Sequence, residues 1–151
     1  MIKDAFKLEL VDAKMVTPSV RHLIFKRADN QKLAFIPGQF ITIHFEMDGV
    51  QYNRSYSIAT IPDQNNLIEF AASPFVGGPG TKFLFAIKPG DQVDTTGPFG
   101  RLILRDEQPK RYIMVATGTG VTPYRTMLPE FLSRLQNQPD LQVVILLGVQ
   151  K

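Results

Sequence analysis

Residues 52–60, Tyr-Asn-Arg-Ser-Tyr-Ser-Ile-Ala-Thr, contain the stretch Arg54-Ser55-Tyr56-Ser57, on which the fold assignment depends. Asp48-Gly49 precedes this run and Pro62-Asp63 follows it, so a short strand between turns is predicted. Side chains two apart on a strand share a face, so Arg54 and Tyr56 should project together. The guanidinium could bind a phosphate and the ring could stack on a flat ligand. Ser57 should point the other way, and its hydroxyl can both donate and accept.

These four residues alone fit equally well a surface strand with a half-buried tyrosine and a solvated arginine. The flanking sequence must therefore decide between the two interpretations. Short apolar or alternating runs, broken by Gly, Pro, Asn and Asp, extend from residue 6 to about residue 105. This spacing predicts an all-β barrel or sandwich. The expected strands are 6–16, 19–27, 39–46, 52–60, 66–73, 91–95 and a shorter one at 101–104.

Composition narrows the function classes. The chain has 151 residues, 44% of them hydrophobic, which suits one domain or one small domain plus part of another. Without cysteine there is no disulfide framework or thiolate ligand, and His22 and His44 are too few for a histidine-rich metal site, so no metal is expected and both histidines are predicted to be structural.

Location and partners follow from the termini and the charge. Residues 1–7 have no signal-peptide character and no 18 apolar residues run together, so a cytoplasmic protein without a membrane partner is predicted. The formal charge of +3 favours an anionic cofactor or an acidic protein partner. It is too small to predict a nucleic-acid partner.

A glycine cluster at residues 77–81, Gly-Gly-Pro-Gly-Thr, leads into an apolar run with helical spacing at Phe83, Leu84 and Ile87. Backbone amides where a loop becomes a helix can bind an anion. Thr81 should cap this helix, and its hydroxyl could reach a phosphate oxygen. A plain glycine turn before a capped surface helix fits the same residues.

The pattern changes at residues 106–110, which we interpret as a domain boundary. Residues 111–116 form a continuous apolar run typical of a buried parallel strand, and residues 141–148 form a second one. Between them lie a turn with Gly118 and Gly120 and an amphipathic helix, for which Thr122 is the expected N-cap; Pro129 should kink that helix. A nucleotide's phosphates would sit at such a turn, although it lacks the third glycine of the dinucleotide fingerprint.

Together these pieces resemble the ferredoxin–NADP reductase superfamily, in which a flavin-binding β-barrel precedes a nicotinamide-dinucleotide-binding α/β domain. Arg54-Ser55-Tyr56-Ser57 is similar to its flavin motif, Arg-x-Tyr-Ser, and residues 118–123 to its Gly-x-Gly-x-x-Pro turn. Residues 37–40, 78–81 and 97–100 resemble its early barrel strand, flavin-pyrophosphate loop and closing turn. The resemblance implies a six-stranded antiparallel β-barrel of Greek-key type over residues 1–107, followed at 108–151 by part of a Rossmann-like, doubly wound α/β domain.

The resemblance also implies roles for individual residues. Arg54 would bind the FAD pyrophosphate, Tyr56 would stack on the isoalloxazine, and Ser57 would hydrogen-bond near flavin N5. Thr122 would lie close to the flavin ring, so that Tyr56, Ser57 and Thr122 form the catalytic set. Further cofactor contacts are expected from Ser55, Phe70, Ala71, Gly78, Gly80, Thr81, Thr117, Gly118 and Gly120. Residues 70–73 lack a basic side chain that many members have there, so that contact would be through the backbone only.

The expected function is that of a flavin-dependent NAD(P)H oxidoreductase with FAD and NADP, or NAD, as cofactors. Hydride would pass between nicotinamide and flavin N5, and electrons would go on to a small carrier such as ferredoxin or flavodoxin. The alternative is a non-catalytic barrel that stacks single-stranded nucleic acid on Tyr52, Tyr56 and Phe70. Scattered Lys and Arg residues disfavour it.

The chain ends at Lys151, just after the second predicted α/β strand, whereas a doubly wound sheet needs five or six strands. A fragment of a longer reductase is therefore expected. Of the few residues after that strand, only Gln150 and Lys151 have polar side chains from which a coenzyme preference could be judged, so the sequence does not predict whether NADH or NADPH is preferred. It predicts neither the electron acceptor nor the oligomeric state.

Overall fold

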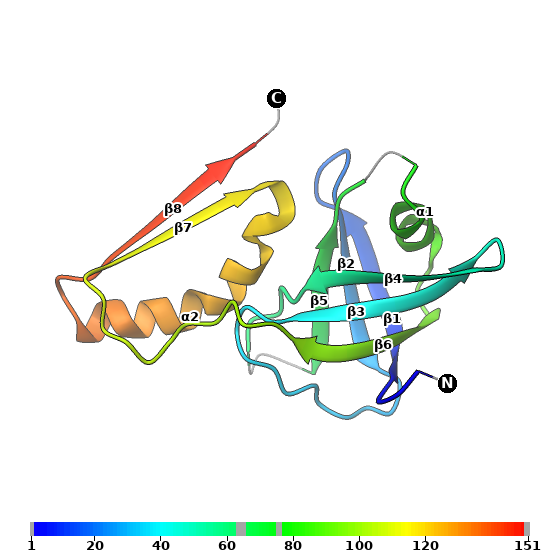
Figure 1. The fold of residues 1–151 in the computed structure, drawn as a ribbon, viewed down its shortest axis with the longest axis horizontal. Helices are drawn as coiled ribbons and strands as arrows, with labels where there is room; N and C mark the ends of the chain where they lie inside the picture. The colour runs from blue at the N-terminus through cyan, green and yellow to red at the C-terminus, as the bar shows by residue number, and fades with distance from the viewer. Residues whose placement is uncertain (1, 63–65, 75–76, 150–151) are drawn as a thin grey trace.

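The computed structural model describes residues 2–62, 66–74 and 77–149. Over these residues it shows a six-stranded antiparallel sheet with the order β4-β3-β6-β1-β2-β5 and a two-stranded parallel sheet (Figure 1). The barrel elements are β1 (Phe6–Met15), β2 (Arg21–Arg27), β3 (Phe40–Met47), β4 (Val50–Ser57), β5 (Leu67–Ala72), α1 (Pro79–Ala86) and β6 (Gln92–Phe99). The second sheet belongs to an α/β unit with β7 (Arg111–Thr117), a 3₁₀ helix (Gly118–Val121), α2 (Thr122–Asn137) and β8 (Gln142–Gly148).

Alternation along the strands builds the barrel core. In β3, Ile41, Ile43 and Phe45 are buried, while the residues between them are partly exposed. β2 repeats the pattern with Leu23 and Phe25. Side chains of one face thus meet inside the barrel, because successive strand residues point to opposite faces. Partly buried aromatic side chains, among them Tyr52, Tyr56 and Phe83, pack against this core.

The two edge strands of the sheet, β4 and β5, approach each other. Tyr56 on β4 stacks on Phe70 of β5, with ring centroids 4.8 Å apart and an interplanar angle of 21°. α1 covers one end, where Phe83 stacks on Phe45 at 4.3 Å. Arg21 donates to the carbonyl oxygens of Leu84 (2.6 Å) and Ile87 (2.9 Å), which satisfies acceptors at the C-terminal end of α1. The six-stranded barrel predicted from the sequence is confirmed.

Two strand predictions and one turn prediction differ from the structure. Residues 101–104 form no strand; they leave the sheet, and Leu104 packs against the core under α2. The turn predicted at residues 97–100 is instead the end of β6, since Phe99 pairs with Phe40 of β3. The strand predicted at 52–60 ends earlier, at Ser57. Beyond it, the amide of Ile58 donates to the carbonyl oxygen of Gln39 and the amide of Ala59 to that of Glu69.

Both predicted helix caps are wrong. α1 begins at Pro79 with Gly78 as the N-cap, three residues before the predicted cap, so Thr81 lies inside the first turn; the fixed φ of proline favours the first helical position. Thr122 is the first residue of α2, not its cap. The 3₁₀ helix runs directly into α2, and the Thr122 hydroxyl donates to the carbonyl oxygen of Thr119 at 2.6 Å.

The α/β unit is a parallel strand pair with one covered face. α2 packs on that face through Met127 and Phe131, which meet Met114 of β7. Figure 1 shows α2 on one side of β7 and β8 only. The other face leaves Ile113 60% exposed, Val115 64% and Leu146 53%. Pro129 lies inside α2, and the kink expected there stays a prediction.

The connection between barrel and α/β unit runs along α2. Arg134 donates to the carbonyl oxygens of Glu107 (2.9 Å) and Arg105 (3.0 Å) and to the hydroxyl of Tyr112 (2.5 Å). These bonds fasten the linker to the helix. The division of the chain into domains at residues 107 and 108 stays a prediction.

Candidate functional site

Arg54 and Tyr56 project from the same face of β4. In the β3–β4 ladder Arg54 lies opposite Ile43 and Tyr56 opposite Ile41, both buried. Tyr56 is half-buried, and burial raises the pKa of its phenol above the ordinary value of 10.0, an effect that the charge of Arg54 opposes. Arg54 is exposed. The shared face predicted from the sequence is therefore present.

A cavity of about 470 Å³ lies between this face and the start of α1. We call it the β4–α1 cavity. A side-chain carbon at Gly80 would come within 3.0 Å of the Tyr56 hydroxyl and 3.1 Å of Arg54 Cγ. A larger residue at this position would have to push the Tyr56 or Arg54 side chain aside, so glycine suits the close approach of α1 to β4. The residues that line the β4–α1 cavity are Arg54, Tyr56, Ser73, Gly77, Gly78, Pro79, Gly80 and Thr81.

This cavity offers the groups that bind a phosphate. Arg54 brings a guanidinium to one wall, and Gly80 stands at the second helical position, where the backbone N–H has no acceptor within the helix. The positive end of the α1 dipole points to the same wall. A phosphate-bearing ligand with a flat ring could bind here, with its phosphate at Arg54 and its ring beside Tyr56.

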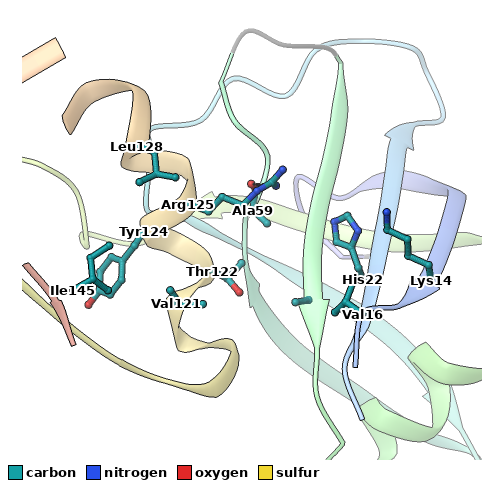
Figure 2. Close-up of a pocket in the computed structure, with 11 residues that line it drawn as sticks. Lys14, Val16, His22, Ala59, Val121, Thr122, Tyr124, Arg125, Leu128 and Ile145 are labelled. Atoms are coloured by element: carbon teal, nitrogen blue, oxygen red, sulfur yellow. Dashed lines mark hydrogen bonds between the residues drawn. The ribbon is translucent and has the colours of Figure 1, made fainter. Parts of the chain in front are cut away.

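A second cavity, of about 520 Å³, lies between the barrel and α2 (Figure 2). We call it the interface cavity. Thr122 and Ala71 line it, so these two predicted site residues lie apart from the β4–α1 cavity. Its lining residues are Lys14, Val16, His22, Ala59, Ala71, Val121, Thr122, Tyr124, Arg125, Leu128 and Ile145.

The glycine turn after β7 lies near the margin of the β4–α1 cavity. Thr119 Oγ1 is 3.5 Å from Oγ of Ser73, which lines that cavity. Gly118 has a φ of +51°, in the left-handed region that favours glycine. At Gly120 the nearest atom to an added side-chain carbon would be 3.9 Å away, so the turn leaves space for a ligand to approach. Thr117, Gly118 and Gly120 are not among the residues that line the two cavities.

Three further predicted site residues, Ser55, Ser57 and Phe70, are not among the residues that line the two cavities. Ser55 turns to the opposite face of β4, where its hydroxyl is 3.0 Å from that of Thr42. Phe70 is fully buried and stacks on Phe25 as well as on Tyr56. Ser57 ends β4, half-buried and opposite Phe40. A ligand contact at Ser55 or Phe70 would have to come from the backbone.

Two residues of α2 that the sequence did not single out join the α/β unit to the barrel. Arg125 Nη1 donates to the carbonyl oxygen of Ala59 (2.5 Å) and to Oε2 of Glu69 (2.9 Å). The Thr126 hydroxyl accepts the backbone N–H of Gly38 at 2.9 Å. Both residues lie in the first turns of α2, but the groups that they contact are distant in the sequence, so no local pattern marks them.

Both histidines hold hydrogen bonds within the barrel. His22 Nε2 is 3.1 Å from Oε2 of Glu69. His44 lies 2.7 Å from the side-chain oxygen of Asn53 and 2.8 Å from the hydroxyl of Thr96. In the part of the chain that the structure describes, no group of three or more His, Asp or Glu side chains could hold a metal ion.

Residues 7–103 match a family described as the oxidoreductase FAD-binding domain. The chain belongs to this family. The predicted membership of the ferredoxin–NADP reductase superfamily is thereby confirmed, and the barrel is an FAD-binding domain.

Curated relatives agree with the assignment. Ferredoxin–NADP reductase B of Sorangium cellulosum is 36% identical over 125 residues, covering 83% of this chain and 51% of the relative. Ferredoxin–NADP reductase of Azotobacter vinelandii is 34% identical over 131 residues, covering 84% of this chain and 48% of the relative. The chain thus spans about half the length of these relatives.

Among solved structures, a cytochrome P450 reductase of Amycolatopsis has the same fold, with a TM-score of 0.80 at 23% identity. The alignment covers 97% of this chain and 44% of that protein. It includes residues of both the FAD-binding barrel and the α/β unit, because the barrel elements alone end at Phe99. No helix among residues 2–62, 66–74 and 77–149 is long and apolar enough to cross a membrane.

The β4–α1 cavity of this FAD-binding domain fits the cofactor. Its close glycine at position 80 leaves room at the helix start, and Arg54 supplies the charge that a pyrophosphate requires. The Tyr56 ring is already fixed by its stack on Phe70, so little conformational freedom would be lost on binding.

Proposed function

We propose that this chain is the flavin-binding part of an NAD(P)H oxidoreductase. Bound FAD supplies the redox chemistry, since its N5 accepts a hydride from reduced nicotinamide and its electrons can then leave singly. The observation that carries the proposal is the β4–α1 cavity, where Arg54, Tyr56 and the close glycine at position 80 converge. The protein's own task is to bind, orient and shield the reacting rings.

Arg54 is proposed to hold the pyrophosphate together with Gly78, Gly80 and Thr81. A charge-assisted contact fixes the ligand along the strand, and the helix start supplies backbone donors. Tyr56 is proposed to orient the isoalloxazine by stacking. The stack on Phe70 fixes the plane of its ring and therefore the plane on which the flavin would lie.

Ser57 and Thr122 are proposed to stand on either side of the reacting centre. Ser57 ends β4, directly after Tyr56, and its hydroxyl would hydrogen-bond to flavin N5. Thr122 begins α2, and Gly118 and Gly120 in the preceding turn would admit the nicotinamide nucleotide. Thr117, Ser55, Phe70 and Ala71 would contribute backbone contacts at the margins.

The electron acceptor is proposed to be a small carrier such as ferredoxin or flavodoxin, and the coenzyme to be NADP or NAD. The net charge of +3 suits an acidic protein partner. A cytoplasmic location, where nicotinamide nucleotides and such carriers occur, is part of the proposal. The barrel of residues 1–107 and the α/β unit of residues 108–151 would act as separate domains.

A nucleic-acid-stacking barrel is disfavoured by the placement of its aromatic residues. Phe70 is fully buried, and Tyr52 stacks on Phe45 with ring centroids 5.5 Å apart. A stacking platform needs exposed rings beside a basic groove. These rings are instead part of the barrel core.

Anaerobic reduction tests the proposed function. The chain is loaded with FAD and mixed with NADPH or NADH, and the loss of flavin absorbance is followed beside free FAD at the same concentration. Bound FAD should be reduced faster than free FAD by at least one of the two nucleotides. Reduction no faster than that of free FAD, with dithionite still reducing the bound flavin, would contradict the proposal.

A further inference from the structure

The Arg125 side chain crosses from α2 to the barrel (Figure 2). A single nitrogen, Nη1, donates to both the Ala59 carbonyl oxygen (2.5 Å) and Glu69 Oε2 (2.9 Å). The Arg125 side chain is 44% exposed, and that of Glu69 is 14% exposed. The Glu69 carboxylate is therefore the more enclosed partner of this ion pair.

Glu69 is held from two sides. His22 on the neighbouring strand β2 lies 3.1 Å from the same Oε2 atom that receives Arg125. The backbone of Glu69 is also occupied, since its amide donates to the Thr60 hydroxyl (2.7 Å) and its carbonyl accepts the amide of Ala59 (2.7 Å). Glu69 and the segment at residues 59–60 thus form one hydrogen-bonded unit.

Residues 59–60 of this unit follow closely after the end of β4 at Ser57. Ala59 follows Ser57 by two residues, so the carbonyl group that Arg125 binds belongs to the segment that continues from the proposed flavin contact. On the other side, Arg125 follows Thr122 by three residues, within one helical turn. The Arg125 contact therefore joins the backbone near Ser57 to the helix turn that carries Thr122.

Thr126 fixes the same turn of α2 at a second point. Its hydroxyl accepts the Gly38 amide at 2.9 Å and donates to the Pro123 carbonyl oxygen at 2.7 Å. A side chain at Gly38 would overlap the Leu102 carbonyl oxygen, so this approach is close as well. With two attachments the first turns of α2 can neither slide nor rotate freely on the barrel.

We propose that Arg125 is a positioning residue that sets the placement of Thr122 and the glycine turn relative to Ser57, with Glu69 as its receptor on the barrel. The consequence for hydride transfer rests on the proposed function. The attachment itself does not, because it joins two parts of the chain irrespective of ligand. Arg125 itself need not touch FAD or nicotinamide.

The test compares Arg125→Met, Arg125→Lys and Glu69→Gln in the full chain, with Arg101→Met as the control. Arg101 is exposed and has no hydrogen bond or ion pair in the part of the chain that the structure describes. Three measurements are made on each variant: hydrogen exchange of the amides of residues 119–127, except Pro123, which has no amide hydrogen; the Kd for FAD; and the rate of flavin reduction by nicotinamide nucleotide and by dithionite.

Arg125→Met should speed exchange of amides 119–127 by about 10-fold, the scale of one lost coupling between contacting residues. The Kd for FAD should change by less than about threefold, because the proposed anchors at Arg54 and Gly80 are untouched. Reduction by nicotinamide nucleotide should slow by a similar factor of about 10, while dithionite reduction stays the same. Arg125→Lys should restore most of both losses, since one lysine nitrogen can make both bonds.

The double variant Arg125→Met, Glu69→Gln should be no worse than the worse of its single variants. Wild-type exchange at residues 119–127 in Arg125→Met would overturn the proposal. So would Arg125→Lys failing as fully as Arg125→Met, because Nη1 would then not be the group that matters. If no protein is reduced by nicotinamide nucleotide, the proposed function fails, and the exchange result still decides the attachment.

Discussion

The barrel and the α/β unit of residues 111–148 bury their apolar side chains in different ways. The barrel closes its core around residues from all six strands and α1, with stacked rings at the edge between β4 and β5. The α/β unit has a small core of Met114, Met127 and Phe131 and leaves one whole sheet face exposed. A parallel sheet is normally covered on both faces.

This difference shows why the candidate site is divided. The groups proposed to bind FAD lie on the barrel, next to its own hydrophobic core. The residues proposed to meet the nicotinamide lie on the α/β unit, which is held to the barrel through Arg125 and Thr126 and to the linker through Arg134. We therefore expect the α/β unit to be the less stable of the two.

Two leucine truncations should show the largest contrast. Leu23→Ala empties a fully buried barrel position and should lower the free energy of unfolding by about 2–5 kcal/mol. Leu146 lies on the uncovered face of β8 and is 53% exposed. Leu146→Ala should therefore change the free energy of unfolding by less than about 0.5 kcal/mol. Urea unfolding followed by circular dichroism measures both. Similar losses for the two variants would show that the exposed face is covered in solution.

Within the barrel, Arg54→Ala should weaken FAD binding more than Tyr56→Ala does. A charge-assisted contact is worth about 1.5–3 kcal/mol, so the Kd should rise about 10- to 150-fold. A stacking contact is worth about 0.5–1.5 kcal/mol beyond burial. Fluorescence titration of the apo-protein checks the order. Lys82→Ala, an exposed cation on α1, serves as the control, and an equal or reversed order would refute the assigned roles.

The smallest expected effect is a pH dependence specific to the barrel. Because burial raises the pKa of Tyr56, the folded chain holds the phenol proton more tightly than the unfolded chain does. The associated stability is complete below about pH 10 and is lost as the pH rises through the folded pKa. Tyr56→Phe should therefore lose less stability on the alkaline side than the wild type. The free energy of unfolding of both proteins is measured at increasing pH. An equal loss of stability in Tyr56→Phe and in the wild type would contradict this prediction.

Local patterns predicted the barrel well because each strand carries its own signal. The alternation in β3 and the pairing of Arg54 with Tyr56 on one face depend only on the two-residue period of a strand. Residues 101–104 carry the same apolar signal but cover the core under α2, as Leu104 shows. A local pattern does not reveal which partner an apolar residue will meet.

The attachment between the two parts was not predictable in this way. Arg125 binds acceptors 56 and 66 positions away, and neither Ala59 nor Glu69 stands out in the sequence. The prediction of Thr122 as the N-cap of α2 was wrong because of the segment that precedes the helix. N-cap preference describes a helix that begins from extended chain, whereas α2 continues from a 3₁₀ helix.

Titration of the apo-chain with FAD tests the central claim, that the barrel of this chain carries a complete FAD site. Flavin fluorescence should be quenched with saturation at one FAD per chain, and acid precipitation should release all of it, because two non-covalent anchors hold the cofactor. FMN should bind more weakly, since it has one phosphate for the two anchors. No saturable binding of FAD, binding of FMN that is as tight, or flavin that stays in the acid pellet would contradict the account.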